Sequence, residues 1–129
     1  MKILIIEDNE SLAKVLKMAF VSNNYPADYV TSGVVGNQRL GLSPKSYNLI
    51  ILDLMLPEKS GFEIIKDTRQ NKIDIPIVVL SARYEEKDYK KAFELGANGY
   101  FTKPFSFKEL LATVKNLTKK KNGKVFSTN

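Results

Sequence analysis

Three short runs of consecutive aliphatic residues constrain the fold of this chain more than any other feature. They cover residues 3–6, 49–52 and 77–80, and the residues that follow them are Glu7, Asp53 and Ser81. Strands that are buried on both faces of a sheet have such continuous apolar sequences, because neither face meets solvent. Residues 27–31 and 99–102 are weaker strand candidates, and turn-forming residues flank each of them. The sequence therefore predicts five strands.

The segments between these strands have the apolar spacing of helices. Apolar residues recur every three or four positions within 12–19, 62–69, 89–95 and 107–117. Ser60 with Glu63, and Ser106 with Glu109, fit the capping box, in which both side chains accept hydrogen bonds from backbone N–H groups at the start of a helix. Gly96 predicts the end of the helix that contains residues 89–95.

The weakest predicted helix covers residues 33–44. Gly36 and Gly41 each cost about 1 kcal/mol relative to alanine inside a helix. With this helix included, five strands alternate with five helices. Parallel strands need crossover connections, and those connections are right-handed, so the alternation predicts a doubly wound α/β fold: a five-stranded parallel sheet with helices on both faces.

Composition excludes several kinds of chemistry. The 129 residues include no cysteine and no histidine, so they offer no disulfide, thiolate, imidazole base or phosphohistidine. All 14 acidic residues lie before residue 110, whereas five of the 20 basic residues lie after residue 114. We therefore predict one domain over residues 1–118, and a lysine-rich tail or the start of a linker over 119–129. The apolar run at 3–6 is too short for a signal peptide, so we expect a cytoplasmic location and no membrane association.

Acidic residues after two of the predicted strands indicate a metal site. Ligands of doubly wound sheets bind beyond the carboxyl ends of the strands, where this sequence places Glu7, Asp8 and Asp53. Three carboxylates in one crevice repel one another unless a proton or a cation intervenes, and ligand sets made only of oxygen favour Mg²⁺. The alternative is that Asp8 is the N-cap of the following helix and that Glu7 is solvated.

Asp53 ends an apolar strand, so its carboxylate needs a partner. Lys103, after the last predicted strand, would form a structural ion pair with it. In the functional alternative, Asp53 is a nucleophile that accepts a phosphoryl group, while Lys103 and the Ser81 hydroxyl contact the phosphoryl oxygens. Taken as an isolated residue, Ser81 is more often a strand-ending cap. Most X–Pro bonds are trans, so a cis bond between Lys103 and Pro104 is not expected.

Four segments together resemble a known family. They cover residues 3–8, 49–57 with Gly61, 78–82 and 96–105. Their order and spacing resemble the receiver domains of response regulators in two-component signalling, over about residues 2–118. The resemblance implies a flavodoxin-like sheet with strand order 2-1-3-4-5, and a phosphorylation-controlled signalling domain rather than an enzyme.

The resemblance also implies roles for the residues at the strand ends. Asp53 would be the phosphoacceptor. Asp8, Asp53 and the main-chain carbonyl of Met55 would bind Mg²⁺ directly, and Glu7 would hold a metal-bound water. Lys103 would contact the phosphoryl group.

A second set of residues resembles the switch of the family. Ser81 and Tyr100 would relay phosphorylation to the surface formed by the fourth helix, the fifth strand and the fifth helix. Met55 and Arg83 match positions that tune the attack of water on the acyl phosphate, and their large side chains predict a long phosphoryl lifetime.

The sequence departs from the receivers of winged-helix transcription factors at three positions. Those receivers commonly carry an acidic pair before the switch aromatic residue and an arginine in the last helix. This chain has Asn98, Gly99 and Thr113 there, so the dimer salt bridges of those receivers are not expected.

The expected partners are a sensor histidine kinase or a histidine phosphotransfer protein, together with an output domain or target that the sequence does not identify. An apolar patch around Val15 would contribute to docking. The main alternative is a metal-dependent phosphohydrolase on a flavodoxin-like scaffold, which would turn over a small substrate. A receiver that works without phosphorylation is a third reading. Direct DNA binding is not expected, because no recognition-helix pattern occurs.

Overall fold

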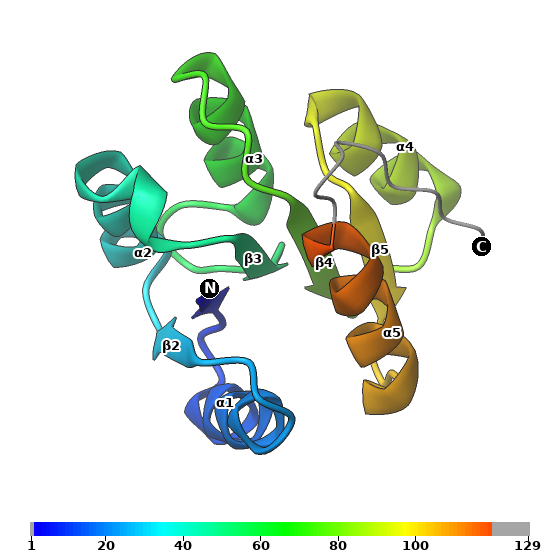
Figure 1. Ribbon diagram of the computed structural model, residues 1–129. Coiled ribbons are helices and arrows are strands. Elements are labelled where there is room, and N and C mark those ends of the chain that lie inside the picture. Colours follow the sequence, from blue (N-terminus) through cyan, green and yellow to red (C-terminus); the bar gives the residue numbers. More distant parts are fainter. Residues whose placement is uncertain (1, 120–129) are drawn as a thin grey trace.

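The computed structural model describes residues 2–119 and shows a five-stranded parallel sheet (Figure 1). The strand order is β2-β1-β3-β4-β5, which confirms the predicted order. The strands are β1 (Ile3–Ile6), β2 (Ala27–Val30), β3 (Leu49–Asp53), β4 (Ile77–Ser81) and β5 (Gly99–Thr102). The predicted tail at 119–129 lies, apart from Lys119, outside the described residues.

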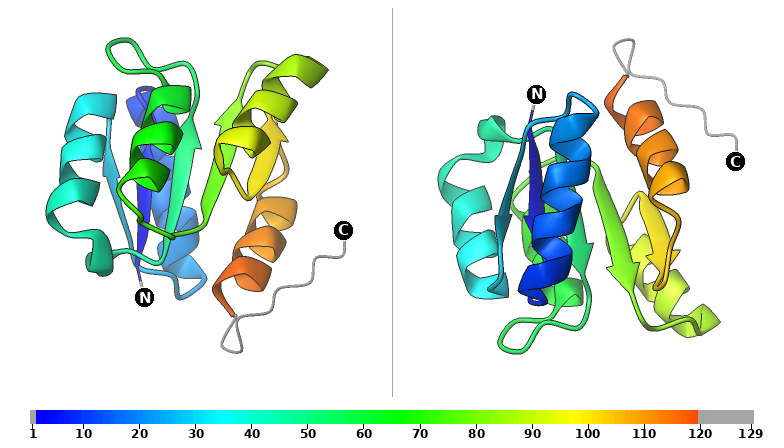
Figure 2. Two further views of the ribbon diagram at one scale, coloured as in Figure 1. Left: turned by 90° about the horizontal axis from the view of Figure 1, so that it is seen from above. Right: turned by 90° about the horizontal axis from the view of Figure 1, so that it is seen from below.

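Five α-helices connect and follow the strands, as predicted. They are α1 (Glu10–Ser22), α2 (Gly33–Leu42), α3 (Gly61–Gln70), α4 (Glu86–Leu95) and α5 (Phe107–Thr118). A short 3₁₀ helix, η1 (Pro44–Ser46), was not predicted. Helices α1 and α5 cover one face of the sheet, and α2, α3 and α4 cover the other (Figures 1 and 2). Among residues 2–119, no helix combines the length and the apolar composition that crossing a membrane requires.

The three apolar runs form the central strands. Every residue of β1, β3 and β4 is buried, whereas the edge strands β2 and β5 include half-buried positions. Side chains alternate between the faces, so that Ile3 and Ile5 pack toward α1 and α5 while Leu4 and Ile6 pack toward α2 and α3. Because a helical layer covers each face, the central strands carry apolar side chains on both faces until the polar last residues of β3 and β4, Asp53 and Ser81.

Gly36 explains why the weakest predicted helix still forms. A Cβ atom at Gly36 would lie 2.6 Å from Cδ1 of Ile6, so the absence of a side chain lets α2 pack closely against β1. Gly41 has no such neighbour within 4 Å. Tertiary packing thus offsets the low helix propensity of this segment.

The predicted caps are mostly confirmed. Ser60 and Glu63 form both hydrogen bonds of the capping box at the start of α3. At α5, the Ser106 hydroxyl accepts a hydrogen bond from the Glu109 N–H, but the reciprocal bond is not formed, so the prediction of a complete box there was wrong. Gly96 ends α4 with a φ of 120°, which glycine adopts without strain.

Candidate functional site

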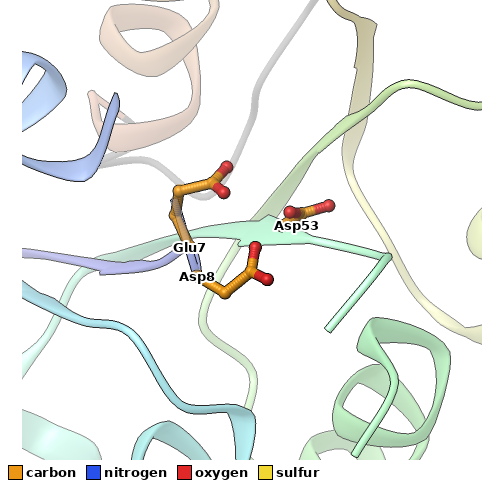
Figure 3. Close-up of side chains that lie close together, drawn as sticks. All are labelled: Glu7, Asp8 and Asp53. Atoms are coloured by element: carbon orange, nitrogen blue, oxygen red, sulfur yellow. The ribbon is translucent and has the colours of Figure 1, made fainter. Parts of the chain in front are cut away.

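Three carboxylates meet at the carboxyl ends of β1 and β3. Glu7 and Asp8 follow β1, and Asp53 is the last residue of β3. Because β1 and β3 are parallel neighbours, with Ile6 opposite Leu52, the residues after these positions emerge at one edge of the sheet. One oxygen atom of each carboxylate lies within 4.8 Å of the others, and Figure 3 shows the side chains grouped at the strand ends.

Two of these carboxylates are buried. Glu7 is 1% exposed and Asp53 is 4% exposed, so the alternative of a solvated Glu7 was wrong. Asp8 is exposed but does not cap α1, because the cap is Asn9, whose Oδ1 accepts a hydrogen bond from the Leu12 N–H at 3.1 Å. The alternative that explained Asp8 as a helix cap was therefore also wrong.

Lys103 is the cation at this site. Its Nζ lies 2.8 Å from Oε1 of Glu7 and 3.4 Å from Oδ2 of Asp53. The predicted contact with Asp53 is present, but the shorter contact with Glu7 was missed, because the sequence does not show how far a lysine at the end of β5 reaches across the sheet. The Lys103–Pro104 peptide bond is cis, contrary to expectation.

Burial and charge shift the pKa values of this pair. Burial raises the pKa of Glu7, and the nearby charge of Asp53 adds to the rise, although hydrogen bonds from Lys103 and the Asn9 N–H oppose it. Burial lowers the pKa of Lys103, but its contacts with Glu7 and Asp53 outweigh this effect and the pKa is raised. One ammonium group therefore faces two buried carboxylates, with Asp8 beside them.

The loop after β3 orients Asp53. The Met55 N–H donates a hydrogen bond to Oδ1 of Asp53 at 2.9 Å. Gly61, the first residue of α3, lies so close to the end of β3 that a Cβ atom there would be 2.5 Å from the Asp53 carbonyl oxygen. The two carboxylate oxygens of Asp53 thus have different surroundings, one held by the backbone and the other facing Lys103.

Ser81 and Tyr100 are linked through the backbone of Arg83. The Arg83 N–H donates to Oγ of the buried Ser81 at 3.0 Å, and the Tyr100 hydroxyl donates to the Arg83 carbonyl at 3.0 Å. The Tyr100 ring packs edge-on against Tyr89, with the ring centroids 4.8 Å apart. A movement of the β4–α4 loop would therefore affect both members of the pair.

Sequence reasoning missed Asp88, a buried residue near this loop. Its Oδ1 accepts a hydrogen bond from Nη1 of Arg83 at 3.0 Å. No periodic signal pointed to this pair, because Arg83 precedes α4 and Asp88 lies within its first turn.

The sequence and the fold match a known family. The sequence profile of the response regulator receiver domain matches residues 3–115. This chain belongs to that family. The receiver domain is 41% identical over 115 residues to the uncharacterized transcriptional regulatory protein YclJ of Bacillus subtilis, an alignment that covers 89% of this chain and 49% of YclJ.

Further comparisons agree. The receiver domain is 39% identical over 120 residues to the transcriptional regulatory protein PcoR of Escherichia coli, covering 92% of this chain and 52% of PcoR. It superimposes on the receiver domain of the Francisella response regulator 1452 with a TM-score of 0.86 and 28% identity, covering 92% of this chain and 97% of that one. The chain spans about half the length of the two transcriptional regulators.

Proposed function

We propose that this receiver domain is a signalling switch that accepts a phosphoryl group on Asp53. The observation that supports this best is the position of Asp53, a buried carboxylate at a strand end, oriented by the Met55 N–H and faced by Lys103. The donor would be the phosphohistidine of a sensor histidine kinase or of a histidine phosphotransfer protein. This role belongs in the cytoplasm, where such kinases find ATP.

The transfer would use Asp53 as a nucleophile. One of its carboxylate oxygens forms a bond to phosphorus while the bond from phosphorus to the donor histidine nitrogen breaks. Lys103 already lies 3.4 Å from Oδ2, so its ammonium would sit beside the incoming phosphoryl oxygens and balance their charge. The Ser81 hydroxyl, at the end of the neighbouring strand, would hydrogen-bond one of these oxygens.

The acidic cluster fits Mg²⁺. It offers only carboxylate oxygens, and Lys103 by itself leaves the three carboxylates with excess negative charge. Asp8, Asp53 and the Met55 carbonyl would bind the ion directly, and Glu7 would hold a metal-bound water. When bound, the ion supplies positive charge that stabilises the phosphoryl oxygens during transfer.

Ser81 and Tyr100 would carry the signal to the surface of α4, β5 and α5. If the Ser81 hydroxyl turns toward the phosphoryl group, it loses its hydrogen bond from the Arg83 N–H. The carbonyl of Arg83 accepts the hydrogen bond from the Tyr100 hydroxyl. A movement of Arg83 would therefore also release the Tyr100 ring, which could then turn inward. The output domain or target protein would recognise the altered surface.

The donor protein would dock beside Lys103. A hollow of about 370 Å³ lies between α1 and the segment from Lys103 to the start of α5, and most of its lining is apolar, including Leu12, Val15, Phe105 and Phe107. Val15 is 61% exposed, so its side chain is available to a partner. A protein bound in this hollow would place its phosphohistidine close to Asp53.

The test is phosphorylation by acetyl phosphate in the presence of Mg²⁺, followed by intact mass measurement. We expect a phosphoryl mass increment on the wild type that is absent with EDTA and absent in Asp53→Asn. Glu63→Gln, a substitution in the capping box of α3, should leave the increment intact. Steady release of phosphate without an increment would instead favour the phosphohydrolase alternative, and no reaction with any donor would favour a receiver that works without phosphorylation.

A further inference from the structure

Asp88 is a buried carboxylate that the proposed switch does not use. It lies in the first turn of α4 and is 5% exposed. A buried carboxylate costs free energy unless a charged or hydrogen-bonding partner compensates it. Its partner is the guanidinium of Arg83, with Nη1 3.0 Å from Oδ1 of Asp88. The position of the Arg83 side chain is therefore tied to α4.

The same guanidinium reaches the loop that orients the phosphoacceptor. Nε of Arg83 donates to Sδ of Met55 at 3.1 Å, and the N–H of Met55 donates to Oδ1 of Asp53 at 2.9 Å. Sulfur is a weak acceptor, so the Met55 contact alone would not hold a long and flexible side chain. The charged bond to Asp88 supplies the stronger hold.

Arg83 and Met55 border the entrance to the acidic cluster. Both line a hollow of about 410 Å³ that also includes Asp8. Asp53 is only 4% exposed, whereas Asp8 beside it is exposed, so a water molecule that attacks a phosphoryl group on Asp53 would approach from the side that this hollow borders. The contact between Arg83 and Met55 bridges the loops after β4 and β3 on one side of that hollow.

We propose that Asp88 is a positioning residue that holds Arg83 across Met55 and thereby slows hydrolysis of the aspartyl phosphate. This inference rests on the proposed function. In hydrolysis, the water oxygen forms a bond to phosphorus and the bond from phosphorus to the Asp53 oxygen breaks, which restores the carboxylate. One water proton stays on the phosphate that leaves and the other passes to solvent. Asp88 and Arg83 exchange no proton in this reaction, because they act only by limiting the approach of water.

Decay of the phosphorylated domain tests the inference. The 129-residue protein is phosphorylated with acetyl phosphate and Mg²⁺, the donor is removed by gel filtration, and the phosphoryl mass increment is followed over time. We expect Asp88→Asn to decay about twofold to fivefold faster than the wild type, the factor that loss of one partly exposed ion pair corresponds to. The rate of phosphorylation should not change. Arg83→Ala should decay equally fast, and combining the two substitutions should add nothing.

The matched control lies on the same turn of α4. Glu86 forms an exposed ion pair with Lys90 at 3.7 Å, so Glu86→Gln removes a carboxylate without touching Arg83 and should decay like the wild type. A readout without phosphorylation is the Arg83 Nε–H signal in ¹⁵N–¹H NMR spectra. That signal should shift and exchange faster with solvent in Asp88→Asn than in Glu86→Gln.

Each result has one meaning. A phosphorylated wild type with an unchanged or slower decay in folded Asp88→Asn overturns the inference and leaves the proposed function standing. The slower decay would mean that Asp88 holds Arg83 away from the phosphoryl group. If Asp88→Asn does not fold, the double variant leaves no unpaired buried charge, and decay at the wild-type rate in that variant overturns the inference. Lack of any increment on wild-type Asp53 overturns the proposed function first.

Discussion

The three residues of the acidic cluster contribute differently to the stability of the fold, because their side chains differ in burial. Glu7 and Asp53 are buried and share Lys103, whereas Asp8 is exposed and adds negative charge beside them. In the absence of a cation, Asp8 therefore opposes stability, while its carboxylate is a proposed ligand of Mg²⁺. One substitution should accordingly have opposite effects with and without Mg²⁺.

We expect Asp8→Asn to raise the melting temperature of the metal-free protein by about 2 °C. It should also abolish most of the rise that Mg²⁺ produces in the wild type, since a ligand that binds only the native state stabilises it. Thermal unfolding followed by circular dichroism, with EDTA or with Mg²⁺, measures both effects. An equal Mg²⁺-dependent rise in Asp8→Asn would contradict the assignment of Asp8 as a ligand.

Asp28 provides a pH-dependent contribution to stability. Burial by itself raises the pKa of Asp28, but hydrogen bonds from the Tyr47 hydroxyl and from Lys2 outweigh it, and the pKa lies below its usual value. A carboxyl group with a lowered native pKa stabilises the fold above the pKa of the unfolded chain, and this contribution is lost as the pH falls through the native pKa.

We therefore expect Asp28→Asn to lower the free energy of unfolding at neutral pH. The difference from the wild type should shrink as the pH is lowered from about 5 to about 3. Urea denaturation at several pH values measures this difference. The control is Glu94→Gln, which removes the charge of an exposed carboxylate. A difference that stays constant over this range would show that the charge of Asp28 is not the cause.

At the scale of elements, contacts with neighbouring elements explain residues that local propensity alone does not favour. Helix α2 contains two glycines in its interior, yet only Gly36 contacts the sheet, through Ile6. Asn98 offers a second example, because its Oδ1 accepts hydrogen bonds from the Ile77 N–H and from Arg69. The Asn98 side chain thus joins the start of β4 to α3.

The two glycines of α2 should respond oppositely to alanine. Gly41→Ala should stabilise the fold by about 0.5–1 kcal/mol, because alanine restricts the unfolded chain and nothing lies within 4 Å of the new Cβ atom. Gly36→Ala should give no gain or a loss, because its Cβ atom would lie 2.6 Å from Cδ1 of Ile6. Urea denaturation of both variants makes the comparison, and a gain in both would show that α2 can shift away from β1.

At the scale of the whole molecule, the parallel sheet is what assembles the site. Four strands, β1, β3, β4 and β5, are consecutive in the sheet, and each brings part of the site to the same edge. The apolar hollow beside Lys103 lies between α1 and the start of α5. Both helices cover the same face of the sheet (Figure 2). The proposed phosphorylation site and the proposed docking surface are therefore adjacent.

This adjacency predicts separable effects on two kinds of donor. Val15→Lys should slow phosphotransfer from a phosphohistidine protein about tenfold or more, because it places a charge in an apolar contact, but it should not affect acetyl phosphate. The matched control is Val34→Lys, which also replaces a partly exposed valine. Val34 lies on α2, which covers the opposite face of the sheet from α1. Rapid-quench measurement of phosphotransfer tests this, and an equal effect of both variants would argue against docking at Val15.

Much of the fold could be predicted because the signals were local. The apolar runs at 3–6, 49–52 and 77–80 became the buried central strands, and the Ser60–Glu63 capping box formed as expected. The cap at Ser106 was only half right, and the cap of α1 was Asn9 rather than Asp8. Neighbouring polar residues compete for the same N–H groups, and sequence alone does not decide that competition.

What the sequence by itself determined is the alternation of strands and helices and the set of polar residues at the strand ends, because periodicity and caps act within a few residues. Only the tertiary structure decided the partners of those residues. Lys103 binds Glu7 more closely than Asp53, and Arg83 joins Asp88 to Met55. Such pairings depend on distances across the sheet and on burial, and these are set by the packing of segments that lie far apart in the chain.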